Sequence, residues 1–201
     1  KAGKVGFIDT NGKELLPFVY ERLVFAAREE KTSYRIVYSS QTVYISPSEH
    51  LKTLIVATKD DRQGVIDISG RIVVPFGTYT QIGFLPPSHL YAAKDSLYAL
   101  LDSNAKPVTS FTYLYQPQRL NDSLFSVAQM KNGEVYYGLI SKAGKLLIPV
   151  KYKDVYLDQS FIKLVKEALE KDSTREGFYS FGKKGNLFRH RYEQTINLYH
   201  W

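Results

Sequence analysis

The stretch Val5–Pro17 reads Val-Gly-Phe-Ile-Asp-Thr-Asn-Gly-Lys-Glu-Leu-Leu-Pro, and clear copies of it return twice along the 201-residue chain. The second copy, Gln63–Pro75, reads Gln-Gly-Val-Ile-Asp-Ile-Ser-Gly-Arg-Ile-Val-Val-Pro, and the third clear copy, Tyr137–Pro149, reads Tyr-Gly-Leu-Ile-Ser-Lys-Ala-Gly-Lys-Leu-Leu-Ile-Pro. Two worn copies occupy residues 98–107 and 178–188. Self-similarity at intervals of a few tens of residues is typical of repeat architectures, so these copies decide the fold.

Each copy has the chemistry of a β-hairpin. The Asp carboxylate can accept a backbone N–H two residues on, and the Gly that follows can adopt the positive φ that closes the turn. The Pro has no N–H to donate, which predicts a strand end or an edge strand, and the opening Gly lets a neighbouring backbone or ring approach closely. The repeated positions, including a Tyr after each Pro, are Gly6, Asp9, Gly12, Pro17 and Tyr20; Gly64, Asp67, Gly70, Pro75 and Tyr79; Asp102 and Tyr113; and Gly138, Gly144, Pro149 and Tyr152.

Strand-like runs lead into the later copies, at Ser48–Ala57, Ser88–Lys94, Ser123–Met130 and Ser160–Val165, and Tyr34–Ile45 predicts one extra hairpin. We therefore expect a single all-β repeat domain of about five antiparallel units, each of three or four short strands. The predicted units are approximately 1–47, 48–87, 88–122, 123–159 and 160–201.

One such unit cannot cover its own apolar face, so neighbouring units must pack together. A propeller-like closed ring is favoured over an open β-solenoid, because four short strands in roughly 40 residues is the size of a propeller blade. Residues 161–171 also match a helical stripe. Their repeat position favours a strand to Val165, followed by a loop or a short helical turn.

Composition excludes several classes of protein. The chain has no Cys, which excludes disulfides and Cys-ligated metal sites, and its 44% apolar residues argue against disorder. No apolar run approaches the length of a transmembrane helix. The net charge of +7 leans only mildly toward the C-terminal half. Because the chain begins at Lys1 inside a strand pattern, we expect a processed or trimmed piece whose targeting segment cannot be read.

The quoted residues resemble the WG repeat family, also called KWG repeats, of bacterial proteins. The copy at Tyr137–Pro149, followed by Tyr152, is closest to the family pattern, whereas Val5 and Gln63 stand where the family has an aromatic residue. The resemblance implies a β-rich repeat module used for interaction, often in surface or exported proteins, with no general catalytic residues. It favours a non-enzymatic binding or scaffold module for a protein or a glycan, in an extracytoplasmic compartment, and leaves the ligand and oligomeric state open.

Candidate chemical sites are few. Asp9, Asp67 and Asp102 are equivalent and could form a carboxylate ring for a metal, but the turn interpretation is favoured because Ser141 replaces Asp in the best copy. The histidines, His50, His89, His190 and His200, have no metal-ligand spacing, and we expect His50 and His89 in loops. The sequence has no nucleophile elbow, Walker loop or Gly-x-Gly-x-x-Gly motif, so it predicts neither a cofactor nor an enzyme.

Three further interpretations concern partners. The 16 tyrosines are assigned mainly to packing between units, with a recognition face at Tyr34–Ile45 and Phe84–His89 as the alternative. The best candidate contact patch is Arg189, His190, Arg191 and Tyr192. A glycan-acting hydrolase would need two carboxylates about 5–10 Å apart in one cleft. Weak polyanion binding would need contiguous positive potential, and nucleic acid is not expected as the partner.

Overall fold

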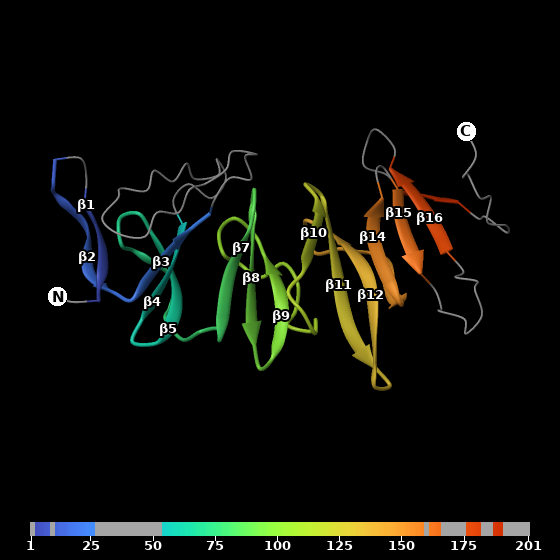
Figure 1. Ribbon diagram of the computed structural model, residues 1–201, viewed down its shortest axis with the longest axis horizontal. Helices are drawn as coiled ribbons and strands as arrows, with labels where there is room; N and C mark the ends of the chain where they lie inside the picture. Colours follow the sequence, from blue (N-terminus) through green and yellow to red (C-terminus); the bar gives the residue numbers. More distant parts are fainter. Residues whose placement is uncertain are drawn as a thin grey trace. The chain divides into compact units, whose positions relative to one another are not determined.

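The structure is a computed structural model, and in its described part the chain is built from strands and turns (Figure 1). It describes residues 3–8, 11–26, 54–158, 161–165, 176–181 and 187–190, with side chains up to residue 155. The all-β prediction is confirmed for these ranges, in several small antiparallel sheets. No helix found there is long and apolar enough to cross a membrane. The chain divides into two compact units, Lys1–Thr112 and Tyr113–Trp201.

The described part of the first unit forms three sheets in chain order, each with antiparallel neighbours. A two-stranded sheet pairs β1 (Val5–Ile8) with β2 (Glu14–Tyr20). A four-stranded sheet has the order β3 (Arg22–Phe25), β4 (Leu54–Lys59), β5 (Arg62–Asp67) and β6 (Ile72–Val74). A three-stranded sheet has the order β7 (Gln81–Leu85), β8 (His89–Lys94) and β9 (Leu97–Leu101).

The second unit contains two four-stranded sheets. The first has the order β10 (Gln118–Asn121), β11 (Leu124–Lys131), β12 (Glu134–Ser141) and β13 (Leu146–Tyr152). The second has the order β14 (Asp154–Asp158), β15 (Phe161–Val165), β16 (Glu176–Phe181) and β17 (Leu187–His190). Strand β15 confirms the strand predicted to Val165, while residues 166–171 lie outside the described ranges, as does the predicted hairpin Tyr34–Ile45.

The sheets are offset by one strand from the sequence repeat. The clear copies form β1–β2, β5–β6 and β12–β13, and the predicted lead-in runs contribute β4, β8, β11 and β15. The strands that follow Tyr20, Tyr79, Tyr113 and Tyr152 each pair with the next lead-in strand rather than with their own copy, as β3 does with β4. Each predicted unit boundary therefore falls between the first and second strands of a sheet. The domain and unit limits themselves stay predictions.

The opening Gly of each clear copy faces a bulge in the partner strand. The register shifts between Val5 and Phe7, across Gly6, and between Tyr137 and Leu139, across Gly138; in the second copy it shifts between Val65 and Ile66, just after Gly64. A Cβ on Gly64 would lie 2.9 Å from the carbonyl oxygen of Val74 and 3.0 Å from the ring of Phe76. The Pro of each clear copy lies in or directly after the bulged edge strand, where no ladder donor is needed.

The worn copy at residues 98–107 departs from this pattern, and its sequence explains why. Its turn is followed at once by Pro107, which makes only an isolated bridge with Leu101, so the sheet has three strands. Without a bulged fourth strand there is room for the buried methyl of Ala99, where the clear copies have Gly. The loss of the opening Gly and the loss of the fourth strand are therefore linked.

In the described residues, apolar clusters form the core of each unit. Within the first unit, Leu16 and Tyr20 of β2 pack with Ile55, Ala57 and Ile66 of the next sheet. The opposite side of that sheet, including Val56 and Val65, packs with Leu90, Ala92 and Leu101 of the three-stranded sheet. The cluster in the second unit contains Leu124, Leu139, Ile148, Tyr152 and Val155. A closed propeller is not shown in the described ranges, so ring closure and the repeat number stay predictions.

Candidate binding surface

Asp67 organises the turn between β5 and β6. Its Oδ1 accepts hydrogen bonds from the backbone N–H of Ser69 at 2.9 Å and of Arg71 at 3.0 Å, and from the Ser69 hydroxyl at 2.6 Å. Its Oδ2 accepts one from Arg71 Nε at 2.8 Å. The Ser69 and Arg71 side chains are the main causes that lower the Asp67 pKa from 3.8 to about 2. All these contacts close one turn, and they leave the carboxylate no role as a free ligand.

The equivalent residues of two other copies also accept backbone hydrogen bonds that close their turns. Asp102 Oδ1 accepts the N–H of Asn104 at 2.8 Å and of Lys106 at 2.9 Å, and Ser141 Oγ accepts the N–H of Lys145 at 3.2 Å. The described residues contain no group of three or more His, Asp or Glu side chains that could hold a metal. Asp9 lies outside the described residues. The turn geometry thus explains why a hydroxyl can replace the carboxylate. The left-handed turn position is held by Gly12 (φ 82°), Gly70 (φ 83°), Gly144 (φ 77°) and, in the worn copy, Ala105 (φ 59°).

The repeated tyrosines lie in the interior of the protein. Tyr20, Tyr113 and Tyr152 are buried, and Tyr79 is partly buried, with its ring centroid 5.3 Å from that of Phe111. Burial raises the pKa of the Tyr79 and Tyr113 hydroxyls. Tyr20 stacks on Phe76, which follows β6, with the two ring centroids 6.3 Å apart. These positions support packing as the main use of the repeated tyrosines.

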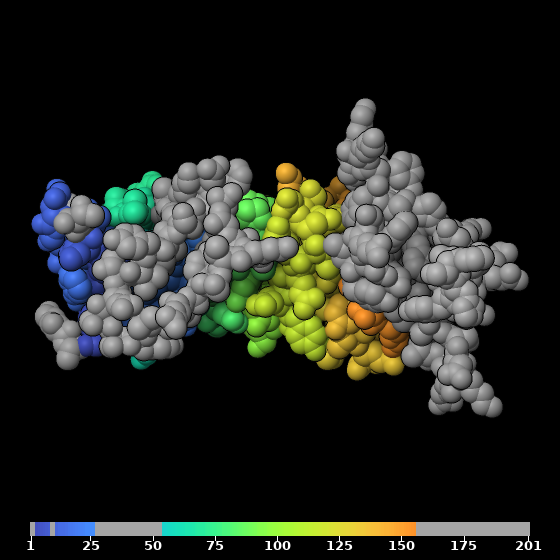
Figure 2. Space-filling model, turned by 45° about the horizontal axis from the view of Figure 1, so that its top comes forward, coloured from blue at the N-terminus to red at the C-terminus, as the bar shows by residue number. Residues whose placement is uncertain are grey.

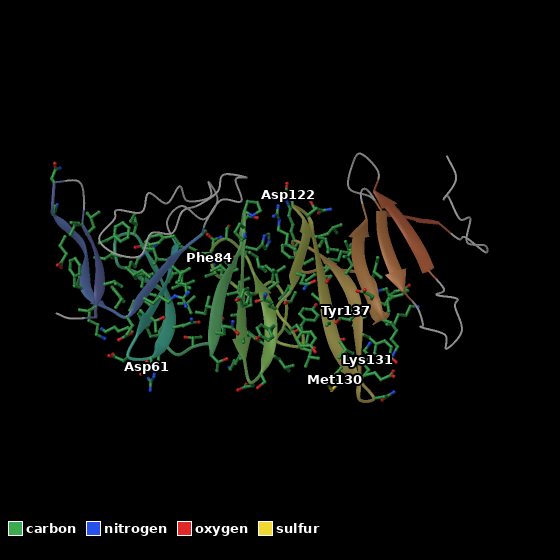
Figure 3. All side chains as sticks on the ribbon, viewed as in Figure 1. Asp61, Phe84, Asp122, Met130, Lys131 and Tyr137 are labelled. Carbon is green, nitrogen blue, oxygen red and sulfur yellow. The ribbon has the colours of Figure 1, made fainter. Side chains whose placement is uncertain are left out.

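Two loop predictions need correction. His89 is the first residue of β8 and is buried, with its Nδ1 3.0 Å from the Ser88 hydroxyl, rather than lying in a loop. Phe84 does not project into solvent, because it lies in β7 and packs against the core of the first unit (Figure 3). The reason is that β7 and β8 pair as far as Leu85 and His89, which leaves only a short turn between them.

The patch predicted from the C-terminal sequence is only partly described. Arg189 and His190 lie in β17, the edge strand of its sheet, and Arg191 and Tyr192 lie outside the described residues, as do His50 and His200. The backbone therefore places the first two residues on a sheet edge. Their use as a contact site stays a prediction.

The structure instead contains a cavity that the sequence did not reveal. It measures about 410 Å³ and lies in the first unit, between the four-stranded and three-stranded sheets. Its described lining exposes polar and apolar surface in about equal amounts and contains no Asp or Glu: Arg22, Val24, Phe25, Val56, Thr58, Gln63, Gln81, Ile82, Gly83, Phe84, Pro86 and Tyr91. The carboxylate pair required by the hydrolase interpretation is therefore missing from this described lining.

The two amides in the cavity wall already have hydrogen-bond partners. Gln63 Oε1 accepts the backbone N–H of Ile82 at 2.6 Å, which ties the two sheets together. Gln81 Oε1 accepts the Tyr98 hydroxyl at 3.0 Å, and its Nε2 donates to the Tyr91 hydroxyl at 3.3 Å. Arg22, by contrast, is exposed, and the side chains described around it give it no ion pair. Gln63 stands at the family's aromatic position, and that substitution was the one sequence signal for this site.

Comparison with known proteins supports the repeat interpretation. The family model for the WG containing repeat matches residues 6–28 and 137–158. This confirms the predicted resemblance to the WG repeat family. The first matched WG repeat runs from β1 into β3, and the second from β12 into β14, so each match crosses from one sheet into the next. No curated protein and no solved structure matches the chain.

Proposed function

We propose that this β-rich repeat module is a non-enzymatic binding module that recognises a protein segment through the cavity between the sheets of its first unit. The observation that carries the proposal is the lining itself. Phe25, Phe84 and Tyr91 offer an apolar surface, and the guanidinium of Arg22 is the charged group beside it. Concave sites that combine apolar surface with a few convergent polar groups are the usual form of a binding pocket.

The state of the amides favours a protein ligand over a glycan. A sugar ring needs several hydrogen-bond partners in its site, but Gln63 Oε1 and both polar atoms of the Gln81 side chain already take part in hydrogen bonds inside the protein. A protein ligand with an apolar side chain next to a carboxylate suits the aromatic residues and Arg22 of the cavity better. Guanidinium and carboxylate groups form strong charge-assisted hydrogen bonds. A bacterial surface or exported location is part of the same proposal and rests on the family resemblance.

Amide NMR shifts test the proposal with defined probes: the capped peptides Gly-Phe-Asp-Gly and Gly-Phe-Lys-Gly, and cellobiose. We expect the acidic peptide to shift the signals of Gln63 and Ile82 at roughly millimolar concentration, the affinity of a weak single-site ligand. Arg22→Gln should remove the preference for Asp over Lys. Lys59→Gln removes an equal charge from the exposed end of β4 and should leave that preference unchanged. A larger response to cellobiose, or none to either peptide, would contradict the proposal.

The propeller-like ring, with the open solenoid as its alternative, is also kept as a proposal. It is supported by the four-stranded sheets, which have the size of propeller blades. Small-angle scattering separates the two shapes. For 201 residues a compact ring should give a radius of gyration near the value for a globular domain, about 16–17 Å, and an open array a clearly larger one.

A further inference from the structure

The first copy of the repeat is exposed where the other copies are buried. Ile8, at the end of β1, is 53% exposed, whereas the residues at the same repeat position, Ile66, Leu101 and Ile140, are each 0% exposed. The sequences of the four strands are alike at this point, so the residue type does not cause the difference. What differs is the pairing, because among the described strands β1 has one neighbour, β2.

The other sheets show which kind of strand occupies the equivalent position. Strands β5, β9, β12 and β16 each pair with a lead-in strand, namely β4, β8, β11 and β15. In the described ranges, β1 pairs with β2 alone. Among the strands that the structure describes, none pairs with its other edge. Such an edge is a ready template for another strand.

The outer face of the same hairpin is also open. Phe18 of β2 is 44% exposed, whereas its equivalent in the next copy, Phe76, is partly covered by Tyr20 of the preceding hairpin. Within the first unit, β1 and β2 lie at the end beyond β3–β6 (Figures 1 and 2). A face that is covered in one copy by the preceding repeat is thus bare in the first.

Gly3 has the backbone conformation of a hairpin-turn residue. In the complete hairpins, the second turn residue has a positive φ: 58° at Asp61, 63° at Ser96 and 79° at Gly133. Gly3 has a φ of 80°. The sequence spacing agrees, because Lys1 precedes Gly6 by five residues, as Lys59 precedes Gly64 and Lys94 precedes Ala99. Lys59 and Lys94 are each the last residue of a lead-in strand.

We propose that the free edge of β1 accepts one antiparallel strand of the lead-in type, joined to it in the same polypeptide through the turn at Gly3. The chemistry of that strand follows from the pairing of β4 with β5, where Ala57 lies opposite Gly64 and Ile55 opposite Ile66. The accepted strand places a small residue opposite Gly6 and a large apolar residue opposite Ile8. It buries the edge and part of the apolar surface that the first copy now exposes.

The test adds six residues, Thr-Leu-Ile-Val-Ala-Thr, directly before Lys1 of the full chain. They copy residues 53–58, so Lys1 takes the place of Lys59 and the added Ala lies opposite Gly6. A matched control carries Pro in place of the added Ile and Ala, because Pro cannot donate to a ladder. We expect amide exchange in β1 to slow by about tenfold or more and the thermal midpoint to rise in the strand version alone. Equal exchange in the two versions would overturn the proposal.

A second copy of the chain is the competing occupant, and sedimentation of the unextended chain tests it. If β1 edges paired between two molecules, the chain would dimerise with rising concentration and Ile8→Asp would abolish the dimer. That result would overturn the proposal that the accepted strand belongs to the same polypeptide as β1. A chain that stays monomeric, and whose β1 gains protection only from the added strand, supports the proposal.

Discussion

Replacing Gly64 with Ala tests the close approach of strands that defines each copy. The added Cβ would lie 2.9 Å from the Val74 carbonyl oxygen and 3.0 Å from the Phe76 ring. The first contact is with backbone that belongs to the bulged edge strand, so it cannot be relieved by turning a side chain. The strand pair must move apart by a few tenths of an ångström.

The sign of the effect makes this substitution informative. In an ordinary strand, changing Gly to Ala stabilises by roughly 0.5–1 kcal/mol, because Gly loses more backbone entropy on folding. Overpacking a tight site costs typically about 1–3 kcal/mol. Since the nearest contact is shorter than ordinary Cβ contacts, we expect the overpacking cost to exceed the entropic gain. The free energy of unfolding should then fall by about 1–2 kcal/mol.

Urea unfolding followed by tyrosine fluorescence measures this loss, and Ala99→Gly is the matched control. Ala99 occupies the same repeat position in the sheet without a bulged fourth strand, and its methyl group is fully buried. Removing that methyl should also destabilise, by about 1–2 kcal/mol from lost burial and added chain entropy. A stabilising Gly64→Ala would refute the close approach, and a stabilising Ala99→Gly would refute the link between this Ala and the missing strand.

Three further predictions concern turns and the contact between sheets. Because the folded-state pKa of Asp67 lies at about 2 and its ordinary value at 3.8, its contribution to stability is present above about pH 4 and is lost as the pH falls toward 2; the urea midpoint of Asp67→Asn should fall less over that range than that of the natural chain. Asp61→Gly should stabilise the chain by about 1 kcal/mol, because Asp61 has a φ of 58° at the tip of the β4–β5 hairpin (Figure 3), and an unchanged thermal midpoint would contradict this. Gln63→Leu should cost about 1–3 kcal/mol by leaving the Ile82 N–H without its acceptor, whereas Gln81→Leu, which loses only exposed hydrogen bonds, should cost less than about 1 kcal/mol; equal losses in urea unfolding would argue against the inter-sheet bond.

The local structure of each copy follows from its sequence because its causes are local. The bonds from Asp67 to Ser69 and Arg71 span two to four residues, and the positive φ at Gly70 is a property of one residue. Alternating apolar runs on either side of such a turn leave few structures other than a hairpin. Even the replacement of the opening Gly by Ala99 in the worn copy at residues 98–107 goes with a structural difference, the three-stranded sheet.

The grouping of strands into sheets has causes that are distant in the sequence. β3 pairs with β4 across residues 27–53, and no local pattern around Tyr20 shows which strand β3 joins. The cavity has the same origin, because Arg22, Gln63 and Phe84 come from three different strands. Gln63 was visible only as a departure from the family pattern, and its bond to Ile82 needed the arrangement of two sheets.

Disulfide trapping between β3 and β4 tests the central claim that the strand after each repeated Tyr joins the sheet of the next copy. Arg22 and Thr58 are register partners, and opposite residues in antiparallel strands lie about 4.5–5.5 Å apart at Cα, within the range of a disulfide. The chain has no Cys, so the pair Arg22→Cys and Thr58→Cys has no competitor. We expect this pair to oxidise rapidly in the folded chain, and the control pair Arg22→Cys and Lys94→Cys to stay reduced. Equal oxidation of the two pairs, or oxidation of the first only in urea, would contradict the offset arrangement of the sheets.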